Sequence, residues 1–155
     1  MDKKELMLRA CQLAEKSVRC GGGPFGALIT KNGEIIAEGN NCVTINHDPT
    51  AHAEITAIRK ATEILGTHDL SGCEIYTSCE PCPMCLGAIY WAHIDKIYYG
   101  NNRKDAAMIG FDDDFIYKEL ALSPENRTLP SEVFMQKEAS KAFDMWSKKE
   151  DKIEY

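Results

Sequence analysis

Three residues of this sequence combine metal-ligand chemistry with a spacing that could bring them to one ion. Cys82 and Cys85 are three positions apart, so on a helix their side chains share one face. A helix beginning at Pro81 would favour thiolates there, because the N–H groups and dipole of a helix N-terminus stabilise negative charge. His52 can add a nitrogen ligand from the start of a second helix. Two sulfurs and one imidazole suit Zn²⁺, so we predict zinc ligands at His52, Cys82 and Cys85.

Glu54 lies two residues after His52, where its side chain stays near the predicted metal. Three protein ligands leave a fourth position for water, and zinc lowers the pKa of bound water to roughly 7. A carboxylate beside such a water can act as a general acid and base. The alternative is an acidic residue that merely favours a helix N-terminus. We predict that Glu54 is catalytic.

Cys79 provides a competing interpretation of the same cluster. It precedes Cys82 by three residues, so a closed site of three cysteines and one histidine is conceivable, as in a non-catalytic zinc-stabilised binding domain. Cys79 stands before Pro81, however, and should belong to the incoming loop. The other cysteines are expected to be small buried apolar residues; they are Cys11, Cys20, Cys42 and Cys73.

Two strand-to-helix junctions would position the predicted ligands. A capping box at residues 2–5 begins a helix that ends before the glycine run at 21–23, and Asn32-Gly33 predicts a type I′ hairpin. Asp48 and Pro49 should begin the helix that carries His52. The other predicted helices are 81–92 and 138–149, the predicted strands are 25–30, 35–38, 73–78, 94–99 and 131–136, and 111–119 should be a loop and short helix. This alternation predicts a sheet with helices on its faces.

Length and charge restrict the class of protein. The chain has 155 residues, which predicts a single domain over 1–155. Its formal net charge of −6 argues against a nucleic-acid partner, which calls for a basic face. There is no signal peptide and no apolar run of the ~20 residues that a membrane span needs. We expect a cytoplasmic protein whose seven cysteines are free thiols or metal ligands.

The segment His52-Ala53-Glu54 followed by Pro81-Cys82-Pro83-Met84-Cys85 resembles the signature of zinc-dependent nucleobase deaminases. The chain is similar over nearly its whole length to the cytidine deaminase-like superfamily, and most similar to its bacterial guanine deaminase branch. Further matching segments are 22–27, 48–54, 77–92, 110–113, 115–119 and Glu154-Tyr155. The resemblance implies one zinc ion per subunit and hydrolysis of a purine base, guanine, to xanthine and ammonia.

The same resemblance implies a three-layer α/β/α sandwich around a mixed five-stranded sheet. It also implies a homodimer that exchanges the C-terminal segment 138–155 between subunits. The residues it places in the substrate site are Phe25, Asn41, Ala53, Trp91, Asp113 and Tyr155, the last reaching the pocket of the other subunit. By chemistry, an amide and a carboxylate suit the polar edge of a base, and aromatic rings can stack on it. Taken alone, the aromatic residues could equally be core residues and the acid part of a solvated turn.

Other substrates stay open on this sequence. The segments 98–104 and 138–149 look less familiar within the guanine deaminase branch. Guanosine or another aminopurine or aminotriazine is therefore an alternative substrate. A tRNA adenosine deaminase shares the metal motif, but it should present a basic surface to its RNA, which an acidic chain fits poorly.

Overall fold

A mixed four-stranded sheet forms the centre of the computed structural model, which describes all 155 residues. The strands are β1 (Gly26–Lys31), β2 (Glu34–Asn40), β3 (Cys73–Cys79) and β4 (Lys96–Asn101), in the order β2-β1-β3-β4. Strand β1 is antiparallel to both β2 and β3, whereas β3 and β4 are parallel. The antiparallel pair β1–β2 turns at Asn32 and Gly33, both with positive φ, which confirms the predicted type I′ hairpin.

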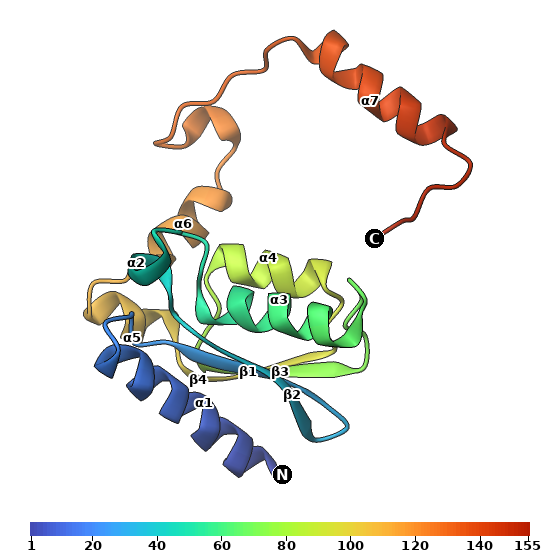
Figure 1. Cartoon of the computed structure of the whole chain (residues 1–155). Coiled ribbons are helices and arrows are strands. Elements are labelled where there is room, and N and C mark those ends of the chain that lie inside the picture. The colour runs from blue at the N-terminus through green and yellow to red at the C-terminus, as the bar shows by residue number, and fades with distance from the viewer. The chain divides into compact units, whose positions relative to one another are not determined.

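Helices cover both faces of this sheet, so the predicted three-layer α/β/α arrangement is confirmed (Figure 1). Helix α1 (Lys3–Arg19) lies on one face, while α3 (Ala53–Leu65) and α4 (Pro83–Trp91) lie side by side on the other. Each face has its own buried cluster. Between α1 and the sheet, the cluster consists of Leu6, Ala10 and Leu13 from the helix and Leu28 and Tyr76 from the strands. The cluster on the other face includes Ala57 of α3, Ile89 of α4 and the strand residues Ala27, Ile29 and Ile75.

The contacts within the chain divide it into two compact units, Met1–Tyr117 and Lys118–Tyr155. The first contains the sheet and also the short helices α2 (Val43–Asn46) and α5 (Arg103–Met108). Helix α6 (Asp113–Leu120) begins in the first unit and ends in the second, which also holds a 3₁₀ turn, η1 (Pro124–Asn126), and α7 (Gln136–Lys148). None of these helices is long and apolar enough to cross a membrane.

The prediction of five strands is wrong, since the sheet has four. The missing one is the strand predicted at residues 131–136, where the chain is irregular up to the start of α7. Its apolar residues are not covered: Val133 is 78% exposed and Phe134 is 79% exposed. An apolar segment forms a strand only where other elements pair with it and cover it.

Two predicted helix starts are also wrong, and both errors matter for the site. Helix α3 begins at Ala53, because Asp48 accepts hydrogen bonds from the backbone N–H and hydroxyl of Thr50 and so forms a turn instead of capping a helix. Helix α4 begins at Pro83, with Cys82 as its N-cap. His52 likewise becomes the N-cap of α3.

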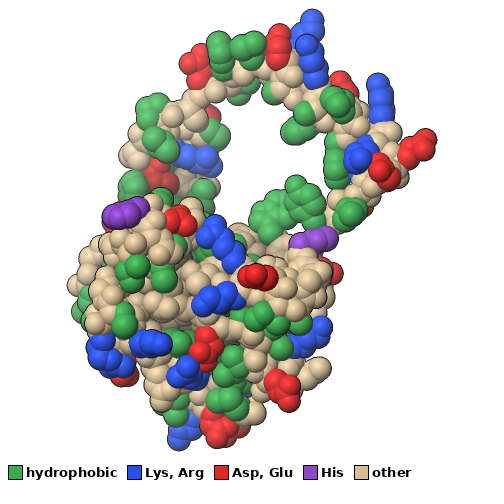
Figure 2. Space-filling model, in the orientation of Figure 1, with side chains coloured by type: hydrophobic (Ala, Val, Ile, Leu, Met, Phe, Trp, Pro, Cys, Tyr) green, Lys and Arg blue, Asp and Glu red, His purple; other side chains and the backbone are tan.

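Positive and negative side chains are mixed over the visible face of the sheet-containing unit (Figure 2). Lys and Arg alternate there with Asp and Glu, as expected for a chain with 18 basic and 24 acidic residues. That face shows no continuous basic surface of the kind that grips a phosphate backbone.

A Gly26→Ala substitution should destabilise the fold, because α1 packs directly on β1 at this position. A Cβ at Gly26 would stand 2.5 Å from Ala10 O and 2.5 Å from Ala14 N, which are backbone atoms of α1. We expect the free energy of unfolding to fall by about 1–3 kcal/mol, the cost of overpacking a core. Urea unfolding of Gly87→Ala is the control: that site in α4 has no atom within 4 Å of a new Cβ, so its stability should stay equal or rise. Equal stability of the two variants would contradict this account of the α1–β1 contact.

Candidate active site and metal centre

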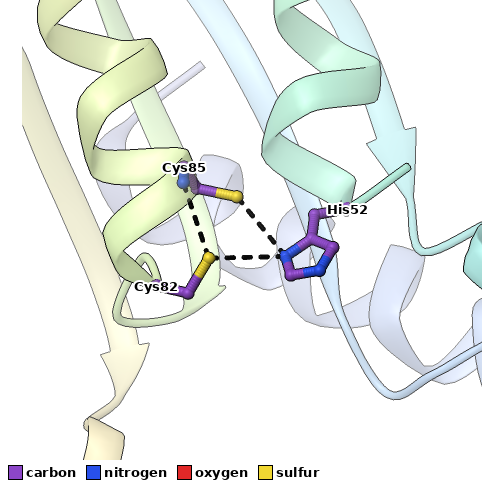
Figure 3. Close-up of side chains that lie close together, drawn as sticks. All are labelled: His52, Cys82 and Cys85. Atoms are coloured by element: carbon purple, nitrogen blue, oxygen red, sulfur yellow. Dashed lines mark hydrogen bonds between the residues drawn. The ribbon is translucent and has the colours of Figure 1, made fainter. Parts of the chain in front are cut away.

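The three predicted metal ligands converge at the N-termini of α3 and α4 (Figure 3). His52 is the N-cap residue of α3, Cys82 is the N-cap residue of α4, and Cys85 lies one turn into α4. The Nδ1 atom of His52 is 3.5 Å from the Sγ atoms of both cysteines. Their ligand atoms all lie within 4.8 Å of one another.

These distances fit a tetrahedral zinc ion. A nitrogen about 2.1 Å and a sulfur about 2.3 Å from one tetrahedral centre lie about 3.6 Å apart. The observed 3.5 Å between His52 Nδ1 and each sulfur is close to that value. Two soft sulfurs and an imidazole also match the chemistry that zinc prefers. The chain therefore presents a nearly preformed three-ligand site.

The environment of Cys82 favours a thiolate. Hydrogen bonds from the Cys85 thiol, from His52 and from the backbone N–H of Cys85 lower the pKa of Cys82 to about 4, against the opposing effect of burial. In turn, the Cys82 hydrogen bond raises the pKa of His52. The Cys85 N–H donates to Cys82 Sγ at 3.5 Å, as an N3 amide does to an N-cap acceptor. The Cys82 sulfur thus caps the helix and is also a candidate metal ligand.

Cys79 is not part of this cluster. Its Sγ faces the backbone oxygen of Asn102 at 3.9 Å, and burial raises the pKa of its thiol to about 12. The structure brings together His52, Cys82 and Cys85 as three ligands, which disfavours the closed four-ligand alternative.

Glu54 lies in the first turn of α3 and is 5% exposed. The Thr77 hydroxyl donates to its Oε1 at 2.9 Å, and the Cys85 thiol donates to its Oε2 at 3.4 Å. Burial raises the pKa of Glu54, which these two hydrogen bonds partly oppose. The carboxyl group is therefore held against the metal ligands, in an environment that permits it to bind and release a proton.

A cavity of about 220 Å³ opens beside the metal ligands. Sites for drug-sized ligands usually measure roughly 300–1,000 Å³, so this one suits a smaller molecule such as a free base. Six of the predicted site residues line it, namely Phe25, Asn41, His52, Glu54, Cys82 and Asp113. Cys85 and Ala53 are fully buried behind that surface.

Asn41 is held rigidly at the cavity wall. Its backbone N–H donates to Phe25 O at 3.1 Å, and its backbone oxygen accepts from the buried Ser17 hydroxyl at 3.2 Å. Its side-chain Oδ1 accepts from the Val43 N–H at 3.2 Å. The glycine at position 23 leaves room for the amide, since a Cβ there would lie 3.1 Å from Asn41 Cγ. With Oδ1 occupied, the Nδ2 group is the part of this amide that can donate to a ligand.

Asp113, the first residue of α6, supplies the second polar group of the cavity wall. Burial raises the pKa of its carboxyl group, and the negative charge of Cys82 raises it further. Trp91 ends α4 and is not among the residues lining the cavity, and Tyr155 belongs to the second unit. Their roles in substrate binding stay predictions.

Sequence reasoning missed several residues of the cavity wall. Phe111 packs edge-on against Phe25 with ring centroids 4.8 Å apart, and both rings line the cavity. The others are Gly23, Val43, Thr44, Cys79 and Glu80. Glu80 immediately precedes the Pro-Cys motif, and Phe111 lies two residues before Asp113, so proximity to the motifs was the only available signal.

Residues 1–101 match the family described as the cytidine and deoxycytidylate deaminase zinc-binding region. The chain belongs to this family of zinc-binding deaminases. The deaminase is 52% identical to the guanine deaminase of Bacillus subtilis (strain 168) over 156 residues, covering 100% of both chains. The X-ray structure of that enzyme superposes with a TM-score of 0.96 over 100% of this chain and 99% of the other. Zinc is therefore the cofactor, and the His52–Cys82–Cys85 cluster matches it in ligand type and spacing.

More distant relatives share only part of this deaminase. A guanine deaminase from Nitrosomonas europaea is 34% identical with a TM-score of 0.70, covering 81% of this chain and 69% of that one. The tRNA-specific adenosine deaminase of Aquifex aeolicus (strain VF5) is 41% identical over 99 residues, 64% of this chain and 66% of its own length. The match to the B. subtilis enzyme thus covers the whole chain, whereas the match to this tRNA-specific deaminase covers 64% of it.

Replacing two cysteines one at a time tests which of them hold the metal. Cys82→Ser should lose most of its zinc, since it removes one of three ligands and a neutral hydroxyl is a poor substitute for a thiolate. Cys79→Ser should keep one zinc ion per chain, because its sulfur lies outside the cluster. The measurement is zinc content by mass spectrometry after dialysis, with circular dichroism to confirm folding. Zinc loss in a folded Cys79→Ser variant would contradict the three-ligand site.

Proposed function

We propose that this deaminase hydrolyses guanine to xanthine and ammonia. The observation that carries the proposal is the match to the B. subtilis guanine deaminase at 52% identity along the entire chain. The cavity agrees with it, since a space of about 220 Å³ beside the metal ligands suits a free base better than a larger substrate.

In the proposed reaction, Glu54 carries the protons. Bound zinc supplies an activated water molecule at neutral pH. Glu54 accepts the proton of that water and delivers it to the ring nitrogen beside the carbon that bears the amino group. It then takes the second proton of the added water and passes it to the leaving amine, so that a C–O bond replaces the C–N bond and ammonia departs. Thr77 holds the carboxylate in place at 2.9 Å throughout.

The polar groups of the cavity can select guanine by its edge. The Asn41 amide has Oδ1 committed to the Val43 N–H, so its Nδ2 can donate to an acceptor of the base. The Asp113 carboxylate can accept from a ring N–H. Phe25 and Phe111 offer apolar surface for the ring. Guanine presents both acceptors and N–H donors, which makes it complementary to this pair of groups.

The alternatives have less support. Guanosine would need room for a ribose in a cavity of about 220 Å³. A tRNA substrate requires a basic surface, whereas the chain has a net charge of −6. A non-catalytic binding domain does not account for Glu54, a buried carboxyl group beside the candidate metal ligands.

Glu54→Gln should retain zinc and lose nearly all turnover. The amide is nearly isosteric with the carboxylate but no longer carries a proton between water and substrate, so we expect kcat to fall by at least about 10²–10⁴-fold. Ammonia release from guanine is the assay, with guanosine, adenine, cytosine, cytidine and a tRNA stem-loop as competing substrates. Chelation should also abolish activity in the wild type, and zinc should restore it. A Glu54→Gln variant with near wild-type turnover would refute the proton-carrying role.

We also propose a cytoplasmic homodimer in which segment 138–155 of each subunit completes the site of the other. The proposal follows the resemblance to guanine deaminases and the exposed apolar face of the second unit. In α7, Phe143 is 78% exposed and Met145 is 73% exposed. Side chains of this kind are usually covered by a partner.

Deletion of Tyr155 should lower kcat/KM at least about tenfold, equal to ~1.4 kcal/mol of transition-state binding, if this residue reaches the partner's cavity. The matched control is Tyr155→Phe, which keeps the ring and should lose less. Sedimentation analysis should find dimers for all three proteins. An unchanged kcat/KM in the deletion variant would remove Tyr155 from the site.

A further inference from the structure

A group of side chains behind the cavity wall joins the substrate-facing helix to the metal-binding segment. Tyr117, in α6, donates a hydrogen bond from its hydroxyl to the backbone oxygen of Pro81 at 2.6 Å. Pro81 directly precedes the ligand Cys82. Tyr117 lies one helical turn after Asp113, so both side chains share one face of α6. A single hydrogen bond thus ties the helix that carries Asp113 to the segment that carries a metal ligand.

Arg103 and Glu80 support this connection from the other side. The guanidinium carbon of Arg103 lies 4.2 Å from the centroid of the Tyr117 ring, a cation–π contact. The Arg103 Nε atom is 3.7 Å from Glu80 Oε2, and its backbone N–H donates to Glu80 Oε1 at 3.1 Å. Glu80 itself lines the cavity. The Tyr117 ring is therefore stacked under a cation that the segment before Pro81 holds in place.

Helix α6 is a surface helix. No residue of this helix is buried, and its start is capped by Asp112, which accepts from the Phe115 N–H at 3.1 Å. The Asp112 contact is local and fixes no distance to the metal ligands. Within the unit that contains the cavity, the Tyr117 hydroxyl is the hydrogen bond by which α6 is fixed to the Pro81–Cys82 segment.

We infer that Tyr117 is a positioning residue for substrate recognition: through Pro81 it sets the distance between Asp113 and the metal centre. Tyr117 does not line the cavity, so it acts through Asp113 and not on the base directly. Arg103 orients the ring for this hydrogen bond. The inference rests on the proposed function for the role of Asp113 in substrate binding and for the choice of guanine in the assay.

Tyr117→Phe tests this role, because it deletes the hydroxyl and keeps the ring under Arg103. KM for guanine should rise roughly three- to tenfold, as the loss of one hydrogen bond allows, while kcat changes less than about twofold. Zinc content and the thermal unfolding midpoint should match the wild type. Tyr76→Phe is the control, because it removes the hydroxyl of another tyrosine, which donates to Glu74 at 3.4 Å. Tyr76 lies on β3 and packs against α1, away from the cavity. This variant should leave KM unchanged.

A double-variant cycle with Asp113→Asn separates positioning from a general structural effect. If Tyr117 acts through Asp113, adding Tyr117→Phe to Asp113→Asn should lower kcat/KM less than about twofold further. An unchanged KM in Tyr117→Phe, a loss of zinc from it, or fully additive losses in the cycle would overturn the inference. Wild-type turnover of guanine alone tests the proposed function. If the wild type prefers another amino-substituted base, the same variant-to-wild-type ratios on that base still decide the role of Tyr117.

Discussion

The structure depends on bringing one imidazole and two thiol groups to a single point, with His52 Nδ1 held 3.5 Å from each sulfur. Thiolates repel each other and lose hydration when buried, so they need compensation on every side. Two helix N-termini provide it, because His52 caps α3 and Cys82 caps α4. These two helices lie side by side on one face of the sheet, which fixes the distance between their first turns (Figure 1).

The same constraint explains the position of Glu54, the proposed acid–base residue. A helix that starts at Ala53 places Glu54 in its first turn, next to the ligand His52. There the carboxyl group is almost fully buried, which favours its neutral form, while Thr77 hydrogen-bonds to it from the neighbouring strand β3. Burial favours the neutral form of Glu54, and the hydrogen bond from Thr77 favours the charged form. Glu54 can therefore exist in both protonation states, as proton transfer requires. Metal and acid–base chemistry are therefore products of one helix junction.

The cavity-wall residues that would select the substrate do not lie at the N-termini of α3 and α4, as the candidate metal ligands do. The cavity wall comes from segments that connect the regular elements: Phe25 precedes β1, Asn41 follows β2, and Phe111 precedes α6. Connecting segments vary more readily than the helices and strands they join. The tRNA-specific adenosine deaminase of A. aeolicus matches 64% of the chain. The full-length match to a guanine deaminase extends to α6 and beyond, where Asp113 and Tyr117 lie.

The sequence by itself determined the chemistry of the centre. His52, Glu54, Cys82 and Cys85 could be chosen from residue types and spacing, because ligand preference and helix periodicity are local properties. The hairpin at Asn32-Gly33 and the capping box of α1 were predictable for the same reason, and the structure contains both.

Only the tertiary structure decided features that depend on which surfaces meet. The helices were predicted to begin at Asp48 and Pro81, but in the structure His52 and Cys82 are their N-cap residues. The first difference arises because Asp48 forms a turn with Thr50. The fifth strand is absent because nothing buries one face of residues 131–136. Phe111 and the Tyr117–Pro81 hydrogen bond depend on contacts between residues far apart in the sequence. Local patterns specify what a side chain can do, whereas burial and long-range packing determine which partner it meets.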